Sequence, residues 1–286
     1  MNNSSNKSSR WLIVWAGLSI LLPILVIYIY SCSENTIKIG QLELKQVSGN
    51  QDVDLIISQI DKSPKKIEKE IVHYVIDSQG IVLNAKTKLP LFTDTTKHRI
   101  LLIGDSEIGG LRYSINDYCR ENGHNIVLAV EWYSATTFNF GRSDTIDKII
   151  AQYKPTYIFM VLGLNELYAK DLKARKKAAD QLADKLKGIP YTWIGPANWD
   201  EDFGINKVYE SSAEPGTYFM SKNLTLTRSQ DGRHPDNTGY RIWMDSIAVW
   251  VQTTAKYKLP MRVPKKRARP YLSPVITINA AKYRGY

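Results

Sequence analysis

Hydrophobic residues follow two different patterns on either side of residues 104–107. Residues 100–103 form an unbroken aliphatic run that ends at Gly104, which is typical of a central parallel strand covered on both faces. The apolar residues that follow recur at steps of three and four: Ile108, Leu111, Ile115 and Tyr118. This spacing predicts a helix that stops near Gly123. The chain here therefore predicts a strand, a sharp turn and a helix.

The same alternation continues as far as residue 253. The predicted strands lie at 125–130, 157–162 and 191–194, and the predicted helices at about 146–150, 171–187 and 237–253. Strands that alternate with helices in this way build parallel sheets. We therefore expect one α/β domain over residues 98–255.

The N-terminal thirty residues differ in character from the rest of the chain. Residues 1–10 are polar and basic, whereas residues 11–30 carry no charge. About twenty such residues can cross a bilayer as a helix, so we predict a transmembrane anchor at 11–30. Lys7 and Arg10 precede this stretch, which favours a cytoplasmic N-terminus at 1–10. The protein would then be single-pass and membrane-anchored, with an extracytoplasmic (periplasmic) catalytic domain.

Two other interpretations of this apolar stretch stay open. Residues 29–32 resemble a bacterial lipoprotein cleavage box that ends at Cys32, although Tyr30 is not its usual residue. The stretch could also be a buried core helix. A cleavable secretion signal is disfavoured, because its apolar region is usually only about 7–15 residues long.

Two segments flank the expected domain. Residues 31–97 predict short strands near 37–44 and a hairpin within 71–83, and they form either a lead-in subdomain or an extended stalk. Residues 256–286 contain nine lysines and arginines and no acidic residue. Together with four prolines between 258 and 274, this predicts an extended tail that binds anionic lipid or an acidic partner. A solvated tail is the alternative.

The formal net charge of +10 is concentrated at the two ends of the chain. Residues 11–255 carry about one net negative charge, so the catalytic region is close to neutral. The sequence contains no helix-turn-helix, zinc-finger or aromatic RNA-binding pattern, and we expect no nucleic-acid partner. Its four histidines and two cysteines lack metal-ligand spacing, so we expect neither a metal nor a cofactor.

Ser106 stands where the first predicted strand ends and its helix begins. Ligands bind beyond the carboxyl ends of parallel strands, and a helix N-terminus there offers free N–H groups. A serine at this point can attack a carbonyl while its own amide stabilises the oxyanion. The alternative is that Asp105 and Ser106 only cap the helix.

Three later polar blocks complement this serine. Asp231 precedes His234 by three residues, so its carboxylate can hold one ring nitrogen while the other accepts a proton. Asn165 follows the strand at 157–162 and can donate a side-chain amide to an oxyanion. Ser134 and Ala135 follow the strand at 125–130. Taken singly, each block is also an ordinary turn signal.

Together these blocks resemble the SGNH (GDSL-type) hydrolase family, in which the serine comes first and the Asp/His pair precedes the last helix. The resemblance implies a three-layer α/β/α, doubly wound, mostly parallel sheet of the flavodoxin-like kind. It also implies that Ser106, His234 and Asp231 are catalytic. The oxyanion hole would be formed by the Ser106 amide, a backbone amide at Ala135 and the Asn165 side chain.

The chain departs from the family pattern at two of these blocks. The family usually has glycine where Ala135 stands, so Ser134 or Gly141 could supply the amide instead. The third block usually ends in aspartate, whereas Glu166 occupies that place here. These departures leave room for a catalytically inactive member.

The resemblance implies a serine ester hydrolase acting on O-acyl, most simply O-acetyl, esters of envelope carbohydrate or on small esters. One alternative is an O-acetyltransferase of an extracellular or cell-wall polysaccharide that works with a membrane acyltransferase partner. A second alternative is an inactive envelope scaffold. Asp105 and Trp199 are candidate substrate-binding residues. The aromatic residues of 195–218, which include Trp199, either contact substrate or cover the core.

Overall fold

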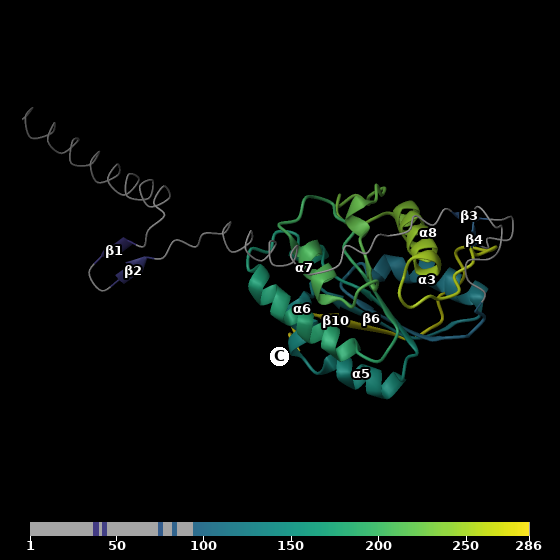
Figure 1. The fold of residues 1–286 in the computed structure, drawn as a ribbon, viewed down its shortest axis with the longest axis horizontal. Helices are drawn as coiled ribbons and strands as arrows, with labels where there is room; N and C mark the ends of the chain where they lie inside the picture. The colour runs from purple at the N-terminus through teal and green to yellow at the C-terminus, as the bar shows by residue number, and fades with distance from the viewer. Residues whose placement is uncertain (1–36, 40–41, 45–73, 77–81, 85–93, 286) are drawn as a thin grey trace, which may run out of the picture. The chain divides into compact units, whose positions relative to one another are not determined.

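The computed structural model describes residues 94–285 and four short strands that precede them. The chain divides into two compact units, Met1–Gln51 and Asp52–Tyr286. In the first unit β1 (Ile37–Ile39) pairs antiparallel with β2 (Leu42–Leu44). In the second unit β3 (Tyr74–Ile76) pairs antiparallel with β4 (Val82–Asn84), and Figure 1 shows both hairpins. Each hairpin falls where short strands were predicted.

A six-stranded sheet forms the centre of the second unit. Its strands are β5 (Arg99–Gly104), β6 (Asn125–Tyr133), β7 (Tyr157–Val161), β8 (Tyr191–Ile194), β9 (Tyr218–Phe219) and β10 (Val275–Asn279). They lie in the order β10-β6-β5-β7-β8-β9, and every neighbouring pair is parallel. Leaving β10 aside, this is the 2-1-3-4-5 order of doubly wound flavodoxin-like sheets. The sheet is thus entirely parallel, where a mostly parallel one was expected.

Helices connect the strands. The α-helices that the structure describes in the second unit are α3 (Ile108–Asn122), α4 (Thr137–Arg142), α5 (Thr145–Tyr153), α6 (Leu172–Leu186), α7 (Ile205–Ser212) and α8 (Asn237–Thr253). Two short 3-10 helices, η1 (Leu164–Glu166) and η2 (Ser221–Asn223), follow β7 and β9. Gly123 ends α3 in the left-handed conformation that glycine adopts at low cost, as the sequence predicted.

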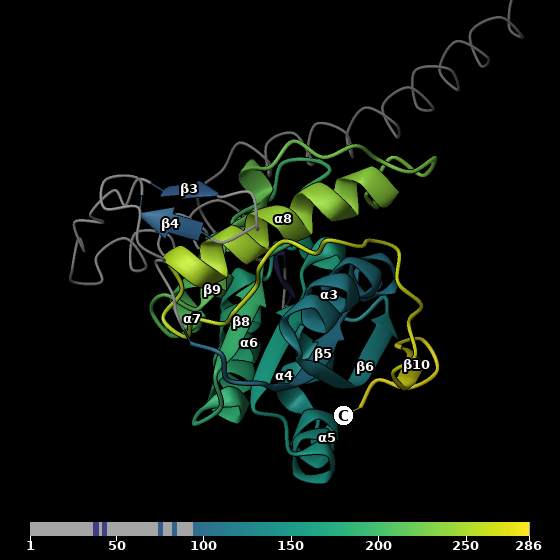
Figure 2. The ribbon, with the colours of Figure 1, turned by 90° about the vertical axis from the view of Figure 1, so that its right-hand side faces the viewer.

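Two hydrophobic cores cover the two faces of the sheet. Ile100 and Leu102 of β5 pack with α3 and α8 on one face. Leu101 and Ile103, the intervening residues, pack with helices α5, α6 and α7 on the other face. Side chains of a strand alternate between faces, so an unbroken aliphatic run requires cover on both sides. Figure 2 shows the resulting layers, with α3 and α8 on one side of the strands and α4, α5 and α6 on the other.

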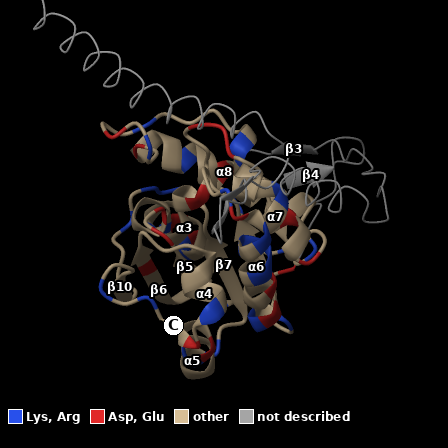
Figure 3. Cartoon of the chain, turned by 90° about the vertical axis from the view of Figure 1, so that its left-hand side faces the viewer, with Lys and Arg blue, Asp and Glu red and all other residues tan. Residues whose placement is uncertain are grey.

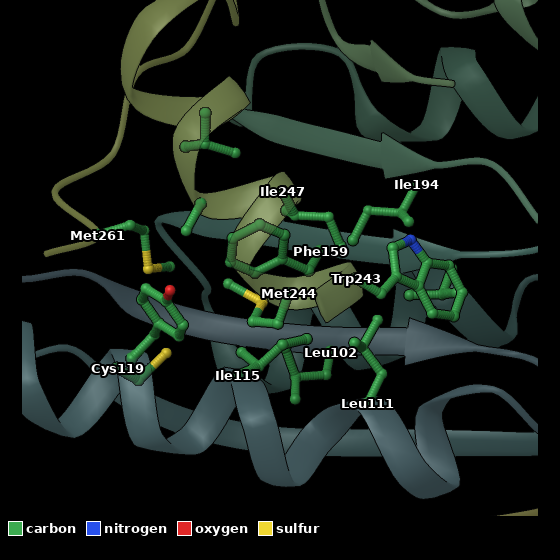
Figure 4. Close-up of a cluster of buried hydrophobic side chains, with 14 of the residues drawn as sticks. Leu102, Leu111, Ile115, Cys119, Phe159, Ile194, Trp243, Met244, Ile247 and Met261 are labelled. Carbon is green, nitrogen blue, oxygen red and sulfur yellow. The ribbon is translucent and has the colours of Figure 1, made fainter. Parts of the chain in front are cut away.

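The core beneath α3 and α8 is closely packed. Figure 4 shows Trp243, Met244 and Ile247 of α8 facing Leu111 and Ile115 of α3. Cys119 lies in the same core and is almost fully buried. Burial raises the pKa of its thiol, so Cys119 acts as a small apolar residue, as the sequence indicated.

The C-terminal segment belongs to this domain, which continues past the boundary expected at residue 255. β10 pairs with β6 from Val275 to Asn279 and forms one edge of the sheet. Leu259 and Met261 are fully buried in the α3–α8 core. Long-range strand pairing of this kind leaves little local signal, because residues 256–286 show neither a helical period nor a long apolar run.

Part of the basic charge in this segment is paired within the protein. Arg267 donates to Asp245 at 2.8 Å and 3.0 Å, and Arg269 forms an ion pair with Glu121. The Asp117 carboxylate accepts from the backbone amides of Ala268 and Arg269. The segment is therefore fastened along α3 and α8. Its binding to anionic lipid or an acidic partner stays a prediction.

Helix α6 carries a second group of positive charges. Figure 3 shows blue lysine and arginine positions along its ribbon. Lys176 and Lys185 pair with Asp180 and Asp147 respectively. Arg175 instead turns toward the buried Glu166, with 2.5 Å between its guanidinium and the carboxylate. Arg175 is thus a charged residue of α6 that pairs inside the domain.

The predicted membrane anchor at 11–30 and Cys32 lie outside the described residues. Within the part of the chain that the structure describes, no helix combines the length and apolar character needed to cross a bilayer.

Candidate active site

Ser106 lies in the tight turn between β5 and α3. Gly104 ends the strand opposite Val161 of β7, and a Cβ at residue 104 would overlap the Val161 carbonyl oxygen. The Asp105 amide donates to that same carbonyl at 3.1 Å. Glycine is therefore required for the close approach of the two strands. The turn places Ser106 at the carboxyl edge of the sheet, beside the point where strand order reverses.

His234 and Asp231 lie in a compact loop ahead of α8. The Ser229 amide donates to the His234 carbonyl at 2.9 Å, which closes the loop. Gly232 turns it in the left-handed region at φ 67°. Asp236 then caps α8 by accepting from the Gly239 amide at 2.7 Å. The residues that looked like ordinary turn-formers therefore shape a loop that holds two polar side chains in place.

The structure brings Ser106, His234 and Asp231 together. Ser106 Oγ lies 2.9 Å from His234 Nε2, and His234 Nδ1 lies 2.6 Å from Asp231 Oδ2. These distances are within hydrogen-bonding range for a proton transfer. A carboxylate opposite Nδ1 favours the tautomer with a proton on Nδ1, which leaves Nε2 as an acceptor.

Asp231 is held as a carboxylate by its neighbours. Hydrogen bonds from His234 and from the Ser229 hydroxyl lower the pKa of the Asp231 carboxyl well below its usual range. Its Oδ1 atom also accepts from the backbone amides of Arg233 and His234, at 2.9 Å and 3.0 Å. The carboxylate is thus fixed in orientation by its own loop, although its side chain is 46% exposed.

Asp105 is a structural clamp, where the sequence had suggested contact with substrate. It is fully buried. Its carboxylate accepts from the amides of Glu107 at 3.0 Å, Gly163 at 3.0 Å and Leu164 at 3.1 Å. Burial raises the pKa of Asp105 to about 6, against the lowering effect of these three donors. At neutral pH the charged carboxylate therefore ties the Ser106 turn to the loop after β7.

Asn165 sits in η1 at the end of that loop. Asn165 is exposed, and it lines a surface cavity together with His234. One N–H of its side-chain amide donates to the Ala135 carbonyl at 3.0 Å. A primary amide has two N–H donors, so the second is left for a ligand.

Glu166, the last residue of η1, joins η1 to the surrounding helices through its carboxylate. It is buried and accepts from the amide and hydroxyl of Thr137, at 2.9 Å and 2.8 Å. The Tyr209 hydroxyl and the Arg175 guanidinium also donate to it. Helices α4, α6 and α7 thereby converge on one carboxylate. The departure from the family's usual aspartate thus carries a packing role at this position.

The amide of Ala135 is not placed as the resemblance implied. Ala135 is fully buried, and its amide donates to the Trp132 carbonyl at 3.1 Å. Ser134 takes the left-handed conformation at φ 57° that favours glycine. Ser134 is exposed, and its amide makes no hydrogen bond among the described residues. Of these two residues, Ser134 is therefore the one whose backbone amide is left without a partner in the described part of the chain.

Gly141, the other alternative, serves helix packing. It lies within α4, where a Cβ would overlap the Ala178 carbonyl of α6. The missing side chain lets the two helices approach closely. Its amide belongs to the helix interior and is not available to a ligand at the sheet edge.

Glu107 lies behind the serine. It is fully buried, and its Oε2 atom accepts from the Tyr240 hydroxyl at 2.9 Å. Its Oε1 atom has no hydrogen-bond partner in the described part of the chain. Burial, reinforced by the nearby Asp105 charge, raises the pKa of Glu107 well above its ordinary value. The fold therefore favours the protonated form of this side chain, which holds the turn to α8 through Tyr240.

A cavity of about 420 Å³ lies on the α3–α8 side of the serine, and a second of about 410 Å³ opens beside His234. The second is lined by Leu164, Asn165, Leu167, Tyr168, Ala169, Arg175, Trp199, Arg233 and His234. The Trp199 and Tyr168 rings meet edge to face at 5.5 Å. Trp199 thus lines the same cavity as His234, and its contact with substrate stays a prediction.

The other aromatic residues of the 195–218 segment separate into two groups. Tyr209 and Tyr218 are buried and cover the core. Phe203 is 44% exposed and packs against Tyr168, with 5.5 Å between ring centroids. The core interpretation therefore holds for Tyr209 and Tyr218, whereas contact of Trp199 or Phe203 with substrate stays a prediction.

Sequence reasoning missed two residues of this cavity, Tyr168 and Arg233. Tyr168 follows the Gly-Leu-Asn-Glu block by two positions, and Arg233 directly precedes His234. Their positions next to the blocks at 163–166 and 231–234 could have indicated that they belong to the site. Exposed tyrosine and arginine are too common on protein surfaces for that signal to be used alone.

Within the described residues, no cluster of three or more His, Cys, Asp or Glu side chains is arranged to hold a metal ion.

No protein-family model matches the chain, and no curated protein does. Among solved structures, a gut microbial diltiazem-metabolizing enzyme matches with a TM-score of 0.40 and 19% sequence identity. The match covers 56% of this chain and 48% of the other, so this chain spans about half the length of that structure. A likeness of this extent does not assign the chain to a family.

Proposed function

We propose that this protein is a serine ester hydrolase that acts on O-acyl esters through an acyl-enzyme. The supporting observation is the continuous hydrogen-bonded line from Ser106 Oγ through both His234 nitrogens to Asp231, with distances of 2.9 Å and 2.6 Å. A free serine hydroxyl is a poor nucleophile and requires an adjacent base. His234 is that base, and Asp231 orients it.

The reaction proceeds in two steps. Ser106 Oγ attacks the ester carbonyl while its proton passes to His234 Nε2, and the alcohol then leaves with that proton. Water attacks the acyl-serine next, again with His234 as base, and releases the carboxylic acid. Asp231 stabilises the imidazolium in both steps and keeps its own charge.

The oxyanion would be bound by three donors, of which the Ser106 amide and the Asn165 side chain approach from opposite sides. The Ser106 amide makes no hydrogen bond among the described residues. The Asn165 side chain uses one of its two N–H groups to bind the Ala135 carbonyl, so the other can bind the oxyanion. The exposed Ser134 amide is the third donor in place of Ala135. Each donor of this kind is worth roughly 10²–10³ in rate.

The substrate class is an acetyl ester of carbohydrate. Aromatic side chains beside the triad, Trp199 and Tyr168, suit the apolar faces of sugar rings. The resemblance to SGNH hydrolases and the predicted anchor at 11–30 favour an envelope glycan as substrate. Membrane attachment through that anchor, or through lipid on Cys32, is part of this proposal.

Activity-based labelling tests the proposal. The wild-type protein should react with a fluorophosphonate at Ser106 and hydrolyse 4-nitrophenyl acetate. Ser106→Ala should lose both properties and keep the circular dichroism spectrum and unfolding midpoint of the wild type. A folded wild-type protein that does neither would overturn the proposal and favour a non-catalytic envelope scaffold.

The same acyl-enzyme can transfer its acyl group to a sugar hydroxyl. An assay with acetylated glycan, run with and without acceptor sugar, separates the two outcomes. Free acetate as the main product supports hydrolysis. Acetylated acceptor in excess of free acetate would instead establish an O-acetyltransferase.

A further inference from the structure

The cavity beside His234 carries an uncompensated positive charge. Two arginines, Arg175 and Arg233, line it, and no acidic side chain does. Arg175 is balanced by Glu166 and Asp171, at 2.5 Å and 3.0 Å. Arg233 makes no ion pair among the described residues. Of the two arginines that line the cavity, Arg233 is therefore the one without a carboxylate partner in the described part of the chain.

Arg233 is held at the cavity by its neighbours. Its guanidinium lies over the Trp199 ring, 4.9 Å from the centroid, a distance typical of a cation–π contact. Its carbonyl accepts from Arg228 at 2.7 Å, and the second guanidinium nitrogen of Arg228 donates to the Asn198 carbonyl at 2.6 Å. The backbones on both sides of the Arg233–Trp199 pair are thus joined through one partly buried guanidinium group.

The contact with Trp199 uses none of the N–H donors of Arg233. A guanidinium has five such donors in a planar fork that matches a carboxylate. The acidic residues closest in sequence to Arg233 and Trp199 make other hydrogen bonds: Asp231 accepts from His234, and Asp200 accepts from the Tyr168 hydroxyl at 2.5 Å. Neither lines the cavity.

We infer that the acyl ester taken by this site also carries a carboxylate, which Arg233 binds while Trp199 contacts the ring that bears it. The chemical class is an acetylated acidic sugar. A cavity of about 410 Å³ is within the range of ligand sites, roughly 300–1,000 Å³. Because Arg233 adjoins His234 in the chain, the bound carboxylate lies on the histidine side of the scissile ester. This inference rests on the proposed esterase function.

Two esters that differ only in charge test it. An acetylated methyl glucuronide carries the carboxylate, and the corresponding glucuronamide replaces it with a neutral group of equal size. We expect kcat/KM for the acid to exceed that for the amide by about tenfold, mainly through KM, because a charged hydrogen-bonded pair is lost with the amide. Added salt should reduce the preference.

Matched arginine variants assign the preference to one residue. Arg233→Gln should abolish the preference, measured as the ratio of kcat/KM for the acid ester to kcat/KM for the glucuronamide ester, and Arg233→Lys should restore part of it. Arg262→Gln is the control, since Arg262 is an exposed arginine near the end of α3, at the opposite edge of the sheet. Equal hydrolysis of the two esters by the wild type, or an unchanged preference in Arg233→Gln, would overturn the inference and leave the esterase proposal intact.

A binding measurement separates the two proposals further. Ser106→Ala should bind the acid more tightly than the amide in calorimetry, and Ser106→Ala combined with Arg233→Gln should not. Because this readout needs no turnover, selective binding with no hydrolysis by the wild type would support the carboxylate site and overturn the esterase proposal. Absence of selective binding would overturn the carboxylate site.

Discussion

Asp105 accepts a hydrogen bond from the Gly163 amide at 3.0 Å, although 58 residues separate them. This bond joins the turn that carries Ser106 to the loop that carries Asn165. The nucleophile and a proposed oxyanion donor are therefore positioned by one buried carboxylate.

Asp105→Asn should weaken both stability and catalysis. Its NH₂ group would face a backbone N–H in either orientation, so at least one amide loses its acceptor. We expect the free energy of unfolding to fall by about 1–3 kcal/mol, the cost of a buried unsatisfied group, and fluorophosphonate labelling of Ser106 to slow. Urea unfolding and labelling rates measure the two effects.

Asp184→Asn, at an exposed position on α6, is the control. Equal behaviour of the two variants would contradict the clamp.

Glu107→Gln should make the protein more stable than the wild type at high pH. The pKa of Glu107 is raised in the folded protein. Its contribution to the free energy of unfolding is therefore complete below about pH 4.5, where Glu107 is protonated in both states. This contribution is lost as the pH rises through the pKa of Glu107 in the folded protein. Glutamine cannot ionise and keeps an acceptor for Tyr240. The stability difference between variant and wild type should therefore grow from pH 5 to pH 9 in urea unfolding. Glu210→Gln, an exposed position on α7, should show no such trend, and a constant difference would refute a neutral Glu107.

Asp231→Asn should reduce kcat while leaving the fold intact. Asparagine retains an oxygen for the Arg233 and His234 amides, but its NH₂ group would face His234 Nδ1. That nitrogen would become the acceptor, and Nε2 would carry the proton toward Ser106. The wrong tautomer lowers kcat by about 10⁴ in serine proteases, and we expect at least about 10² here. Steady-state hydrolysis of 4-nitrophenyl acetate measures it, with the exposed Asp144→Asn as control. A kcat near the wild-type value would exclude a Ser-His-Asp mechanism.

Leu259→Ala should destabilise the domain, although residue 259 lies in the segment first taken for a tail. Leu259 is fully buried between α3 and α8, and truncation of such a leucine costs about 2–5 kcal/mol. Leu272→Ala provides a matched comparison, because Leu272 is 79% exposed in the same segment. Thermal unfolding should place only Leu259→Ala well below the wild type. Two equally mild variants would mean that the segment does not belong to the core.

Local pattern was sufficient for the α/β class and for the elements around the site. The unbroken run at 100–103 requires cover on both faces whatever the neighbouring strands are, and the spacing from Ile108 to Tyr118 defines a helix by its own period. These two signals place Ser106 at a strand-to-helix turn. The Asp231–His234 pair is equally local, because three residues separate its members.

Tertiary structure alone decided which groups are free to act. The sequence suggested that Asp105 contacts substrate and that the Ala135 amide binds the oxyanion, but Gly163 and Trp132 already engage them. It also left unseen the pairing of β10 with β6 and the contact of Arg233 with Trp199. The physical reason is that hydrophobic periodicity indicates only the type of an element and which of its faces is buried. A hydrogen-bond partner, an edge strand or a charge without a counter-ion depends on residues that only folding brings near.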